Sequence, residues 1–357
     1  MKALILSGGK GTRLRPLTYT RAKQLIPVAN KPTLFYGLES IAAAGVRDIG
    51  IIVGETRDEV MAAVGDGSHF GVQVTYIDQP EPRGLAHAVQ TAQNFLGQEP
   101  FIMYLGDNIL RDGVKPFVEA YHAKQPDALI LLTQVDKPEL FGNAVLNPDG
   151  SIRALEEKPR QPKSNLALVG VYLFTAKVHA AIARIKPSGR NELEITDAIS
   201  QMITDGCRVE SHRVAGWWKD TGNAEDLLSA NRVVLERLQG HIQGQAEDAV
   251  KIEGPVSIGP GSIVRRTVLR GPLVIGQGCV IEDCFIGPFT SVDDKCLLSH
   301  CEIEHSIVMK HCQIKQVGQR IENSIFGEHS VVQGQMQLPR SHCFVVGDRS
   351  QISLSQS

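Results

Sequence analysis

Two rhythms of hydrophobic and polar residues divide the chain. From residue 1 to about 238, short apolar runs alternate with stretches of helical periodicity. The apolar runs predict strands and the periodic stretches predict helices; the strands are residues 3–6, 49–53, 72–77 and 101–105, and the helices are 57–64 and 85–95. Because these strands are almost continuously apolar, we expect an α/β fold, a mostly parallel sheet with helices on both faces.

The second rhythm has a period of six residues, with occasional fives. It places aliphatic side chains at Ile252, Ile258, Val264, Leu269, Ile275, Ile281, Ile286, Val292, Leu298, Ile303, Val308 and Ile314. Two positions before each aliphatic residue stands a residue that is nearly always Val, Ser, Thr or Cys. A long inward side chain on each face and a compact one at each corner fit a narrow triangular coil, and the pattern resembles the left-handed parallel β-helix of hexapeptide repeats.

The change of rhythm sets the expected domain organisation. We expect a first domain over residues 1–238, a polar linker over 239–249 and a β-helix domain over 250–357. The chain has seven cysteines and no Cys-x-x-Cys pair, which argues against a disulfide framework and a zinc site. Five of them fall on the compact corner of the repeat, so we expect core packing: Cys279, Cys284, Cys296, Cys301 and Cys312.

Composition narrows the classes of partner. The chain has 357 residues, 42% of them hydrophobic, which suffices for the core of two domains. Its net charge of −2 and lack of a long basic run predict neither a nucleic-acid partner nor a membrane surface. The apolar run at the start is too short for a secretory signal, so we expect a cytoplasmic protein with reduced thiols.

A glycine-rich turn directly after the first predicted strand indicates phosphate binding. It runs Leu-Ser-Gly-Gly-Lys-Gly-Thr-Arg-Leu-Arg-Pro over residues 6–16. Glycines let backbone N–H groups converge on an anion, and Lys10, Arg13 and Arg15 add positive charge. The turn lacks the third glycine of the dinucleotide fingerprint and the Ser/Thr that a P-loop places on magnesium, so neither a dehydrogenase nor a P-loop NTPase is favoured.

The string Gly-Gly-x-Gly-Thr-Arg-Leu-x-Pro-Leu-Thr over residues 8–18 resembles the signature of the sugar-phosphate nucleotidylyltransferases. The loop Gln-Pro-x-Pro-x-Gly-Leu-Ala at 79–86 is more similar to the thymidylyl members than to the uridylyl ones, and the tail resembles the β-helix of their long form. The resemblance implies a Rossmann-like catalytic domain. It also implies synthesis of dTDP-glucose and pyrophosphate from dTTP and α-D-glucose 1-phosphate with Mg²⁺, the first step of deoxysugar nucleotide synthesis.

The reaction joins two polyanions, so its site needs cations, a divalent metal and carboxylates to hold that metal. The resemblance implies that Arg13 neutralises the departing pyrophosphate, that Lys23 lies beside the triphosphate, and that Asp107 and Asp220 hold Mg²⁺. Gly-Asp-Asn at 106–108 directly follows the apolar run 101–105, which predicts that Asp107 lies at the carboxyl end of a strand. The nucleotide is expected on Leu6, Gly8, Gly9, Gly11, Thr12, Arg13, Gln24, Gln79 and Gly84. Gln79 can read the imide edge of a pyrimidine, and Gly84 lets the backbone approach the base.

On the sugar side, the same resemblance implies that Lys158 clamps the sugar phosphate and that Glu157 accepts hydrogen bonds from hydroxyl groups. Gly142 and Leu168 are implied as backbone contacts, and Glu194 borders the pocket; the five sugar-side residues are thus Gly142, Glu157, Lys158, Leu168 and Glu194. One departure is visible, because Asn143 stands where the family often has an aliphatic residue. No serine or cysteine nucleophile is needed, and His69, His87 and His122 are interpreted as ordinary helix or loop residues.

Other functions stay open at this point. The enzyme could use UTP or both nucleotides, because discrimination of the pyrimidine 5-methyl group depends on shape. A non-catalytic subunit that senses nucleotide sugars is the alternative of a different class, although keeping Arg13, Asp107, Lys158 and Asp220 together favours activity. An acyltransferase activity in the tail would use a histidine. It is not favoured, because His300, His305 and His311 fall outside the inward register. We expect a homo-oligomer of unspecified order.

Overall fold

The computed structural model describes residues 1–334, 346 and 352, which form two compact units. One comprises Met1–Lys10, Arg21–Leu25 and Thr33–Lys219, and we call it the sheet unit. The other comprises Gly11–Thr20, Ile26–Pro32 and the chain from Asp220 onward, and we call it the β-helix unit. One boundary between the units falls inside the glycine-rich turn, between Lys10 and Gly11.

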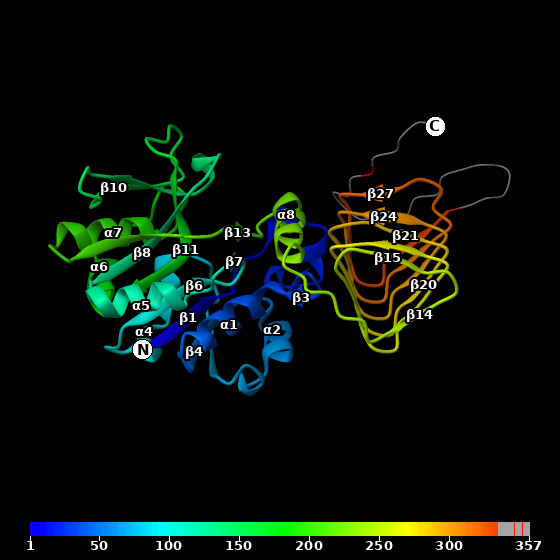
Figure 1. The fold of residues 1–357 in the computed structure, drawn as a ribbon. Helices are drawn as coiled ribbons and strands as arrows, with labels where there is room; N and C mark the ends of the chain where they lie inside the picture. The colour runs from blue at the N-terminus through cyan, green and yellow to red at the C-terminus, as the bar shows by residue number, and fades with distance from the viewer. Residues whose placement is uncertain (335–345, 347–351, 353–357) are drawn as a thin grey trace. The chain divides into compact units, whose positions relative to one another are not determined.

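A nine-stranded sheet forms the centre of the sheet unit (Figure 1). Its main path runs β10-β9-β11-β6-β1-β4-β5, and β8 joins β11 to β12. The strands are β1 (Lys2–Leu6), β4 (Asp48–Val53), β5 (Gln73–Asp78), β6 (Phe101–Leu105), β8 (Ala128–Gln134), β9 (Gly142–Leu146), β10 (Ile152–Glu157), β11 (Leu166–Phe174) and β12 (Val209–Arg213). The path β6-β1-β4-β5 is parallel, as the apolar runs predict.

Helices cover both faces of this sheet, and the alternation of side chains along β1 shows why. Ala3 and Ile5 join a core with α1 (Thr33–Ala43), α2 (Arg57–Val64) and α5 (Lys115–Lys124). Leu4 and Leu6 join the core on the other face. That second core includes α3 (Leu85–Thr91), α4 (Gln93–Leu96), α6 (Lys177–Ile182) and α7 (Ile195–Thr204). The predicted α/β class is therefore confirmed.

The antiparallel part of the sheet did not follow from the apolar runs. β11 is buried at all nine positions and runs antiparallel to β6 and to β8. β9 and β10 form an antiparallel hairpin, with Glu157 opposite Gly142. A buried strand reads as the same apolar run in either direction, so sequence periodicity does not distinguish a parallel neighbour from an antiparallel one.

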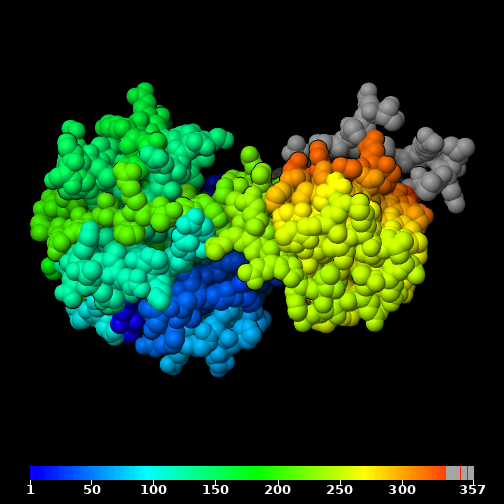
Figure 2. Space-filling model, viewed as in Figure 1, coloured from blue at the N-terminus to red at the C-terminus, as the bar shows by residue number. Residues whose placement is uncertain are grey.

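Three parallel sheets form the triangular coil of the β-helix unit, whose stacked strands are seen in Figure 1 and whose continuous surface is seen in Figure 2. The first sheet holds β14 (Gln245–Glu247), β17 (Ile263–Arg265), β20 (Val280–Glu282), β23 (Leu297–Ser299), β26 (Gln313–Lys315) and β29 (Val331–Gln333). The second holds β15 (Lys251–Glu253), β18 (Val268–Arg270), β21 (Phe285–Ile286), β24 (Glu302–Glu304) and β27 (Ile321–Glu322). The third holds β16 (Val256–Ile258), β19 (Leu273–Ile275), β22 (Thr290–Val292), β25 (Ile307–Val308) and β28 (Ile325–Phe326). This is the architecture expected for the left-handed parallel β-helix.

The hexad register accounts for the core of the coil. Eleven of the twelve repeating aliphatic residues are buried, and the exception, Ile252, lies in the first coil and is 38% exposed. The corner residues two positions earlier are buried as well, except for half-buried Val250. The five corner cysteines are buried free thiols. Their buried position agrees with the expected role in core packing.

The start of the coil bears on the expected domain limits. β14 begins at Gln245, inside the segment 239–249 expected to be a linker. The helix α8 (Ala224–Leu235) and the hairpin of β2 (Pro27–Val28) and β3 (Lys31–Pro32) also belong to the β-helix unit. The end of the predicted β-helix domain, beyond residue 334, lies outside the described residues apart from positions 346 and 352. The division at 238 and 250 stays a prediction. No helix in the described part of the chain combines the length and apolarity needed to cross a bilayer.

Candidate active site

The glycine-rich turn and Asp107 emerge from the same edge of the sheet. β1 and β6 are parallel neighbours with Leu6 opposite Leu105, so both strands end together. The N–H of Gly106 donates a hydrogen bond of 3.0 Å to the carbonyl of Leu6. Gly8 follows one strand and Asp107 follows the other. The predicted position of Asp107 at the carboxyl end of a strand is therefore correct.

Lys23 lies between these two segments. Its ammonium forms an ion pair with Oδ2 of Asp107, and the side chains are 19% and 11% exposed. A Cβ on Gly9 would lie 3.2 Å from Cε of Lys23, so the glycine leaves room for the lysine. A Cβ on Gly106 would lie 3.3 Å from Cγ of buried Gln24. Four expected nucleotide-site positions, Gly9, Lys23, Gln24 and Asp107, thus meet within the sheet unit.

The charge of Asp107 is stabilised locally. Burial raises the pKa of the carboxyl group, but the ammonium of Lys23 and hydrogen bonds from Lys23 and Asn108 outweigh burial, so the pKa lies below the ordinary value. The amide of Asn108 donates to Oδ1 of Asp107 over 3.1 Å. Asp107 is therefore an ionised carboxylate at neutral pH.

Asn108 is a residue that sequence reasoning missed. It is 1% exposed, and its Oδ1 accepts hydrogen bonds from Nε1 of Trp218 and, over 3.3 Å, from the N–H of Gly170. Trp218 stands two residues before Asp220 in β13 (Trp218–Asp220). The Leu-Gly-Asp-Asn string contained the signal, since an asparagine after a strand can bond in several directions at once.

Gln79 is buried directly after β5, at 6% exposure. Its N–H donates to the carbonyl of Val53 over 2.8 Å, which ties the residue to the end of β4. A Cβ on Gly8 would lie 3.5 Å from Oε1 of Gln79, so the amide is beside the glycine-rich turn. The other end of the amide, Nε2, lies 2.8 Å from Nδ1 of His87. His87 lies in α3 (Leu85–Thr91), as its interpretation as a helix residue expects, and it also contacts an expected base-binding residue.

Gly84 has a structural reason to be glycine. Its φ is 102°, and a Cβ there would lie 2.5 Å from the carbonyl oxygen of Leu193. The segment is fixed by hydrogen bonds from the N–H of Leu193 to the carbonyl of Arg83 and from the N–H of Ala86 to the carbonyl of Leu193. A side chain is excluded by backbone packing and strain. The expected contact of Gly84 with the nucleotide base stays a prediction.

Three of the expected sugar-side residues, Gly142, Glu157 and Leu168, also lie together within the sheet unit. A Cβ on Gly142 would lie 3.0 Å from Thr196, 3.1 Å from Oε2 of Glu157 and 3.7 Å from Leu168. Lys158 follows β10 with a φ of 43°, and its side chain is exposed. The unusual Asn143 is buried, and its amide donates to the carbonyls of Ser164 and Leu166. This departure from the family pattern therefore supports the neighbouring segment.

Arg190, which sequence reasoning missed, connects two of these carboxylates. Its guanidinium contacts Glu194 through Nη2 at 2.7 Å and Nε at 3.1 Å, and contacts Glu157 at 3.3 Å. Glu194 is buried and also accepts from Oγ of Ser188 over 2.7 Å. Burial raises the pKa of Glu157, and the nearby charge of Glu194 raises it further. The arginine five residues before Ile195, in a run of acids, was the available signal.

Two further expected residues meet within the β-helix unit. A Cβ on Gly222 would lie 2.9 Å from Nη2 of Arg13 and 3.3 Å from Oδ1 of Asp220. The glycine of Trp-x-Asp-Thr-Gly therefore leaves room for the arginine. Gly11 adopts the left-handed conformation with φ of 59° and begins a short 3₁₀ turn, Thr12–Leu14, which carries exposed Thr12 and Arg13. The expected cation and carboxylate are thus adjacent here.

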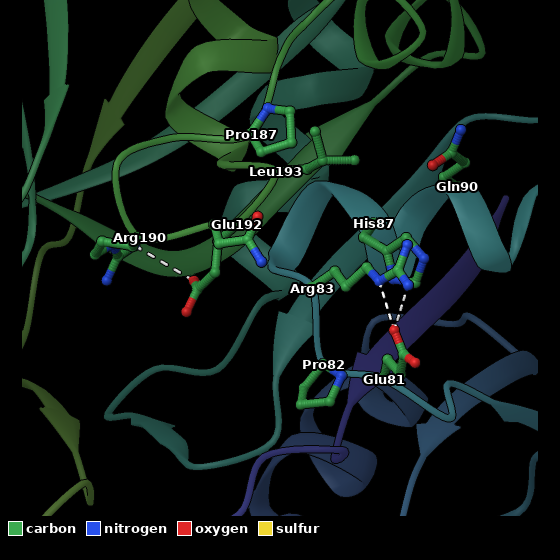
Figure 3. Close-up of a pocket in the computed structure, with 10 residues that line it drawn as sticks. Glu81, Pro82, Arg83, His87, Gln90, Pro187, Arg190, Glu192 and Leu193 are labelled. Carbon is green, nitrogen blue, oxygen red and sulfur yellow. Dashed lines mark hydrogen bonds and ion pairs between the residues drawn. The ribbon is translucent and has the colours of Figure 1, made fainter.

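A cavity of about 560 Å³ opens within the sheet unit, and His87 and Arg190 are among the residues that line it (Figure 3). Figure 3 shows His87 and Arg83 on one side and Arg190, Glu192 and Leu193 on the other. Ion pairs join Arg83 to Glu81 and Arg190 to Glu192. None of the expected site residues is among the described residues that line it, and His87 connects it with Gln79.

The chain belongs to the nucleotidyl transferase family, whose profile matches residues 2–237. It is 50% identical to a glucose-1-phosphate thymidylyltransferase of Streptomyces antibioticus, covering 99% of each chain. It is 49% identical to a protein of the same name from Streptomyces griseus, covering 99% of this chain and 100% of the relative. The β-helix thus lies within the aligned length.

Solved structures agree over about two thirds of the chain. One, from Bacillus anthracis, is assigned as a glucose-1-phosphate thymidylyltransferase and was solved with a sucrose. It is 38% identical, has a TM-score of 0.62 and covers 65% of this chain and 94% of its own. A UDP-glucose pyrophosphorylase complexed with UDP-glucose is 26% identical, has a TM-score of 0.58 and covers 66% and 98%. The chain is therefore a nucleotidyltransferase with a β-helical extension.

Proposed function

We propose that this enzyme transfers a thymidylyl group from dTTP to α-D-glucose 1-phosphate, giving dTDP-glucose and pyrophosphate. The observation that carries the proposal is the ion pair of Lys23 with Asp107 against Gly9 at the carboxyl edge of the sheet. Cation, carboxylate and exposed backbone at one point are what a triphosphate requires. The choice of substrates is supported by two relatives named glucose-1-phosphate thymidylyltransferase, which are 50% and 49% identical over 99% of this chain.

The reaction is a direct in-line displacement. A phosphate oxygen of the sugar phosphate forms a bond to the α-phosphorus of dTTP, and the bond from that phosphorus to the bridging oxygen breaks. The electron pair leaves with pyrophosphate. The attacking oxygen is already ionised at neutral pH, so no general base is needed, and positioning and charge stabilisation supply the catalysis.

Each cation has a stated role in the proposal. Backbone N–H groups of Gly8, Gly9 and Gly11 donate hydrogen bonds to phosphate oxygens. Lys23 sits beside the triphosphate, and Arg13 neutralises the pyrophosphate that leaves, since its planar fork binds two oxygens and keeps its charge. Thr12, Leu6 and Gln24 complete the expected nucleotide contacts.

We assign the metal to Asp107 and Asp220. Magnesium takes one or two carboxylates and fills its shell with phosphate oxygens and water, and the lowered pKa of Asp107 keeps its carboxylate charged. Bound Mg²⁺ supplies neutralisation of the phosphate charge.

On the sugar side, Lys158 clamps the phosphate, and Glu157 accepts hydrogen bonds from sugar hydroxyls. Gly142 and Leu168 present backbone, and Glu194 borders the pocket through Arg190. Gln79 and Gly84 face the base. This arrangement recognises a pyrimidine imide edge. Thymine and uracil share that edge, so the preference for dTTP over UTP is decided by the test below.

A cytoplasmic location and a homo-oligomeric state remain predictions from the sequence.

The test is product formation with a nucleotide panel. Purified enzyme with Mg²⁺ and glucose 1-phosphate is expected to release pyrophosphate and form dTDP-glucose from dTTP, with a lower kcat/KM for UTP. Equal or higher kcat/KM for UTP would make it a dual-specificity or uridylyl enzyme. Absence of product with every nucleotide would favour a non-catalytic role.

A further inference from the structure

The amide of Gln79 is held by a residue outside the expected site. His87 stands in α3, one turn after the Gly84 loop, and its Nδ1 lies 2.8 Å from Nε2 of Gln79. Gln79 is 6% exposed and His87 is half-buried. Oε1 of Gln79 faces the position beside Gly8, where a Cβ would lie 3.5 Å away. One end of the amide therefore contacts the histidine and the other lies at the glycine-rich turn.

In the structure, Nε2 of the amide faces Nδ1 of the ring, and this placement sets the direction of the contact. An amide nitrogen only donates, so Nδ1 of His87 must accept, and the ring must be neutral with its proton on Nε2. The surroundings favour this form: burial lowers the pKa of His87 and the charge of Arg83 lowers it further, against the opposing effect of Glu81. Across the cavity, Arg190 and Glu192 form an ion pair with each other.

A fixed amide direction has a consequence for base recognition. Thymine and uracil present a donor at N3 next to a carbonyl at C4, whereas cytosine presents an acceptor at N3 next to an amino donor. An amide whose Oε1 is free to accept, and whose remaining N–H is free to donate, matches the first pattern. Turning the amide over would match the second.

We infer that His87 is a specificity-determining positioning residue, which locks Gln79 in the direction that accepts keto pyrimidines and rejects cytosine. This inference rests on the proposed function of Gln79 as the base-reading residue. His87 itself touches no reacting atom, and its influence passes through the amide.

The experiment compares kcat/KM for dTTP and dCTP in three variants. In His87→Leu, which keeps bulk and removes the acceptor, the ratio of the two values is expected to fall about tenfold, the size of one hydrogen bond. His87→Asn keeps an acceptor near the place of Nδ1, and its ratio is expected to stay within about threefold of the parent. The control is His122→Leu on the exposed surface of α5, with an unchanged ratio.

A double-mutant cycle separates positioning from general damage. In a Gln79→Leu background, His87→Leu is expected to change the ratio no further, because the amide it positions is gone. An unchanged ratio in His87→Leu, or full additivity in the cycle, would overturn the inference; His87→Ala repeats the test if the leucine variant does not fold. Failure of the proposed function looks different, since the parent enzyme would then form no dTDP-glucose.

Discussion

Lys23 and Asp107, which are 84 positions apart in the chain, form an ion pair at the carboxyl edge of the sheet. The lysine end fills the space that Gly9 leaves open. The pair joins the phosphate turn, the segment after it and the end of β6 in one place. It also explains how a carboxylate can stay charged although it is buried.

Replacing Asp107 by Asn tests the role of that carboxylate in catalysis. The amide keeps the shape but cannot carry the charge that holds a divalent ion, so we expect kcat to fall by a factor of about 100 or more. Circular dichroism and thermal unfolding check that the fold is kept. The exposed Asp149→Asn is the control, with kcat unchanged. Near-parental turnover of the Asp107 variant would refute the role.

The raised pKa of Glu157 predicts how stability depends on pH. A carboxyl group whose folded pKa lies above its unfolded value stabilises the fold below the unfolded pKa of about 4.3, and this contribution is lost as pH rises through the folded value. Glu157→Gln removes the charge, so its Tm relative to the parent is expected to rise with pH and to be higher at pH 7. Thermal unfolding across pH 4–8 measures this.

The same variant is expected to bind sugar less well. A hydrogen bond to a charged acceptor contributes about 1.5–3 kcal/mol, so KM for glucose 1-phosphate is expected to rise about tenfold or more while KM for dTTP stays. A variant with lower Tm at pH 7, or with an unchanged sugar KM, would contradict the account of this side of the site.

The hydrogen bonds of Asn231 predict that its replacement destabilises the β-helix unit. Its buried side chain accepts from the N–H of Ala29 at 2.8 Å and from Oγ of Ser291 at 3.1 Å, and donates to the carbonyl of Phe289 at 2.9 Å. Asn231→Ala leaves several of these groups unsatisfied, so we expect a loss of about 3 kcal/mol in unfolding free energy. Hydrogen exchange at the amide of Ala29 should speed up.

The matched control is Asn94→Ala on the exposed surface of α4. It is expected to change the unfolding free energy by less than about 0.5 kcal/mol. If the amide of Ala29 kept its protection in the Asn231 variant, the hydrogen bond would not be what holds the turn between β2 and β3.

The hexad register predicts position-dependent costs within one repeat. Ile281 is fully buried in β20, whereas Ile252 occupies the same repeat position in the first coil and is 38% exposed. Ile281→Ala is expected to cost about 2–5 kcal/mol, and Ile252→Ala less than about 1 kcal/mol. Denaturant unfolding of the two variants gives the comparison. Equal costs would mean that Ile281 does not pack as the coil requires.

The local patterns of the chain predicted much of this fold. The helix at 57–64 has the predicted bounds, and the hexad aliphatics are buried as the triangular coil demands. These features depend on periodicities that a single segment carries. The direction of β11 did not follow, because it depends on which strands it meets.

The site divides in the same way. Gly9, Lys23 and Asp107 were expected from their motifs, and the structure brings them together. Their ion pair was not expected, and neither were the contacts of His87 with Gln79 and of Arg190 with Glu194. The ion pair joins segments 84 positions apart, so no local spacing predicts it. The other two contacts span only eight and four positions, and they depend on side-chain orientations that the periodicity of the sequence does not give.

The stereochemistry at the α-phosphorus tests the central claim most directly. The enzyme is given one diastereomer of dTTP with sulfur on the α-phosphorus, glucose 1-phosphate and Mg²⁺, and the configuration of the dTDP-glucose analogue is read by ³¹P NMR. A single in-line displacement by the sugar phosphate predicts inversion. Retention of configuration at the α-phosphorus would contradict the claim. Failure to form the thymidylyl sugar from the sulfur analogue would contradict it as well, if the same preparation also fails with dTTP.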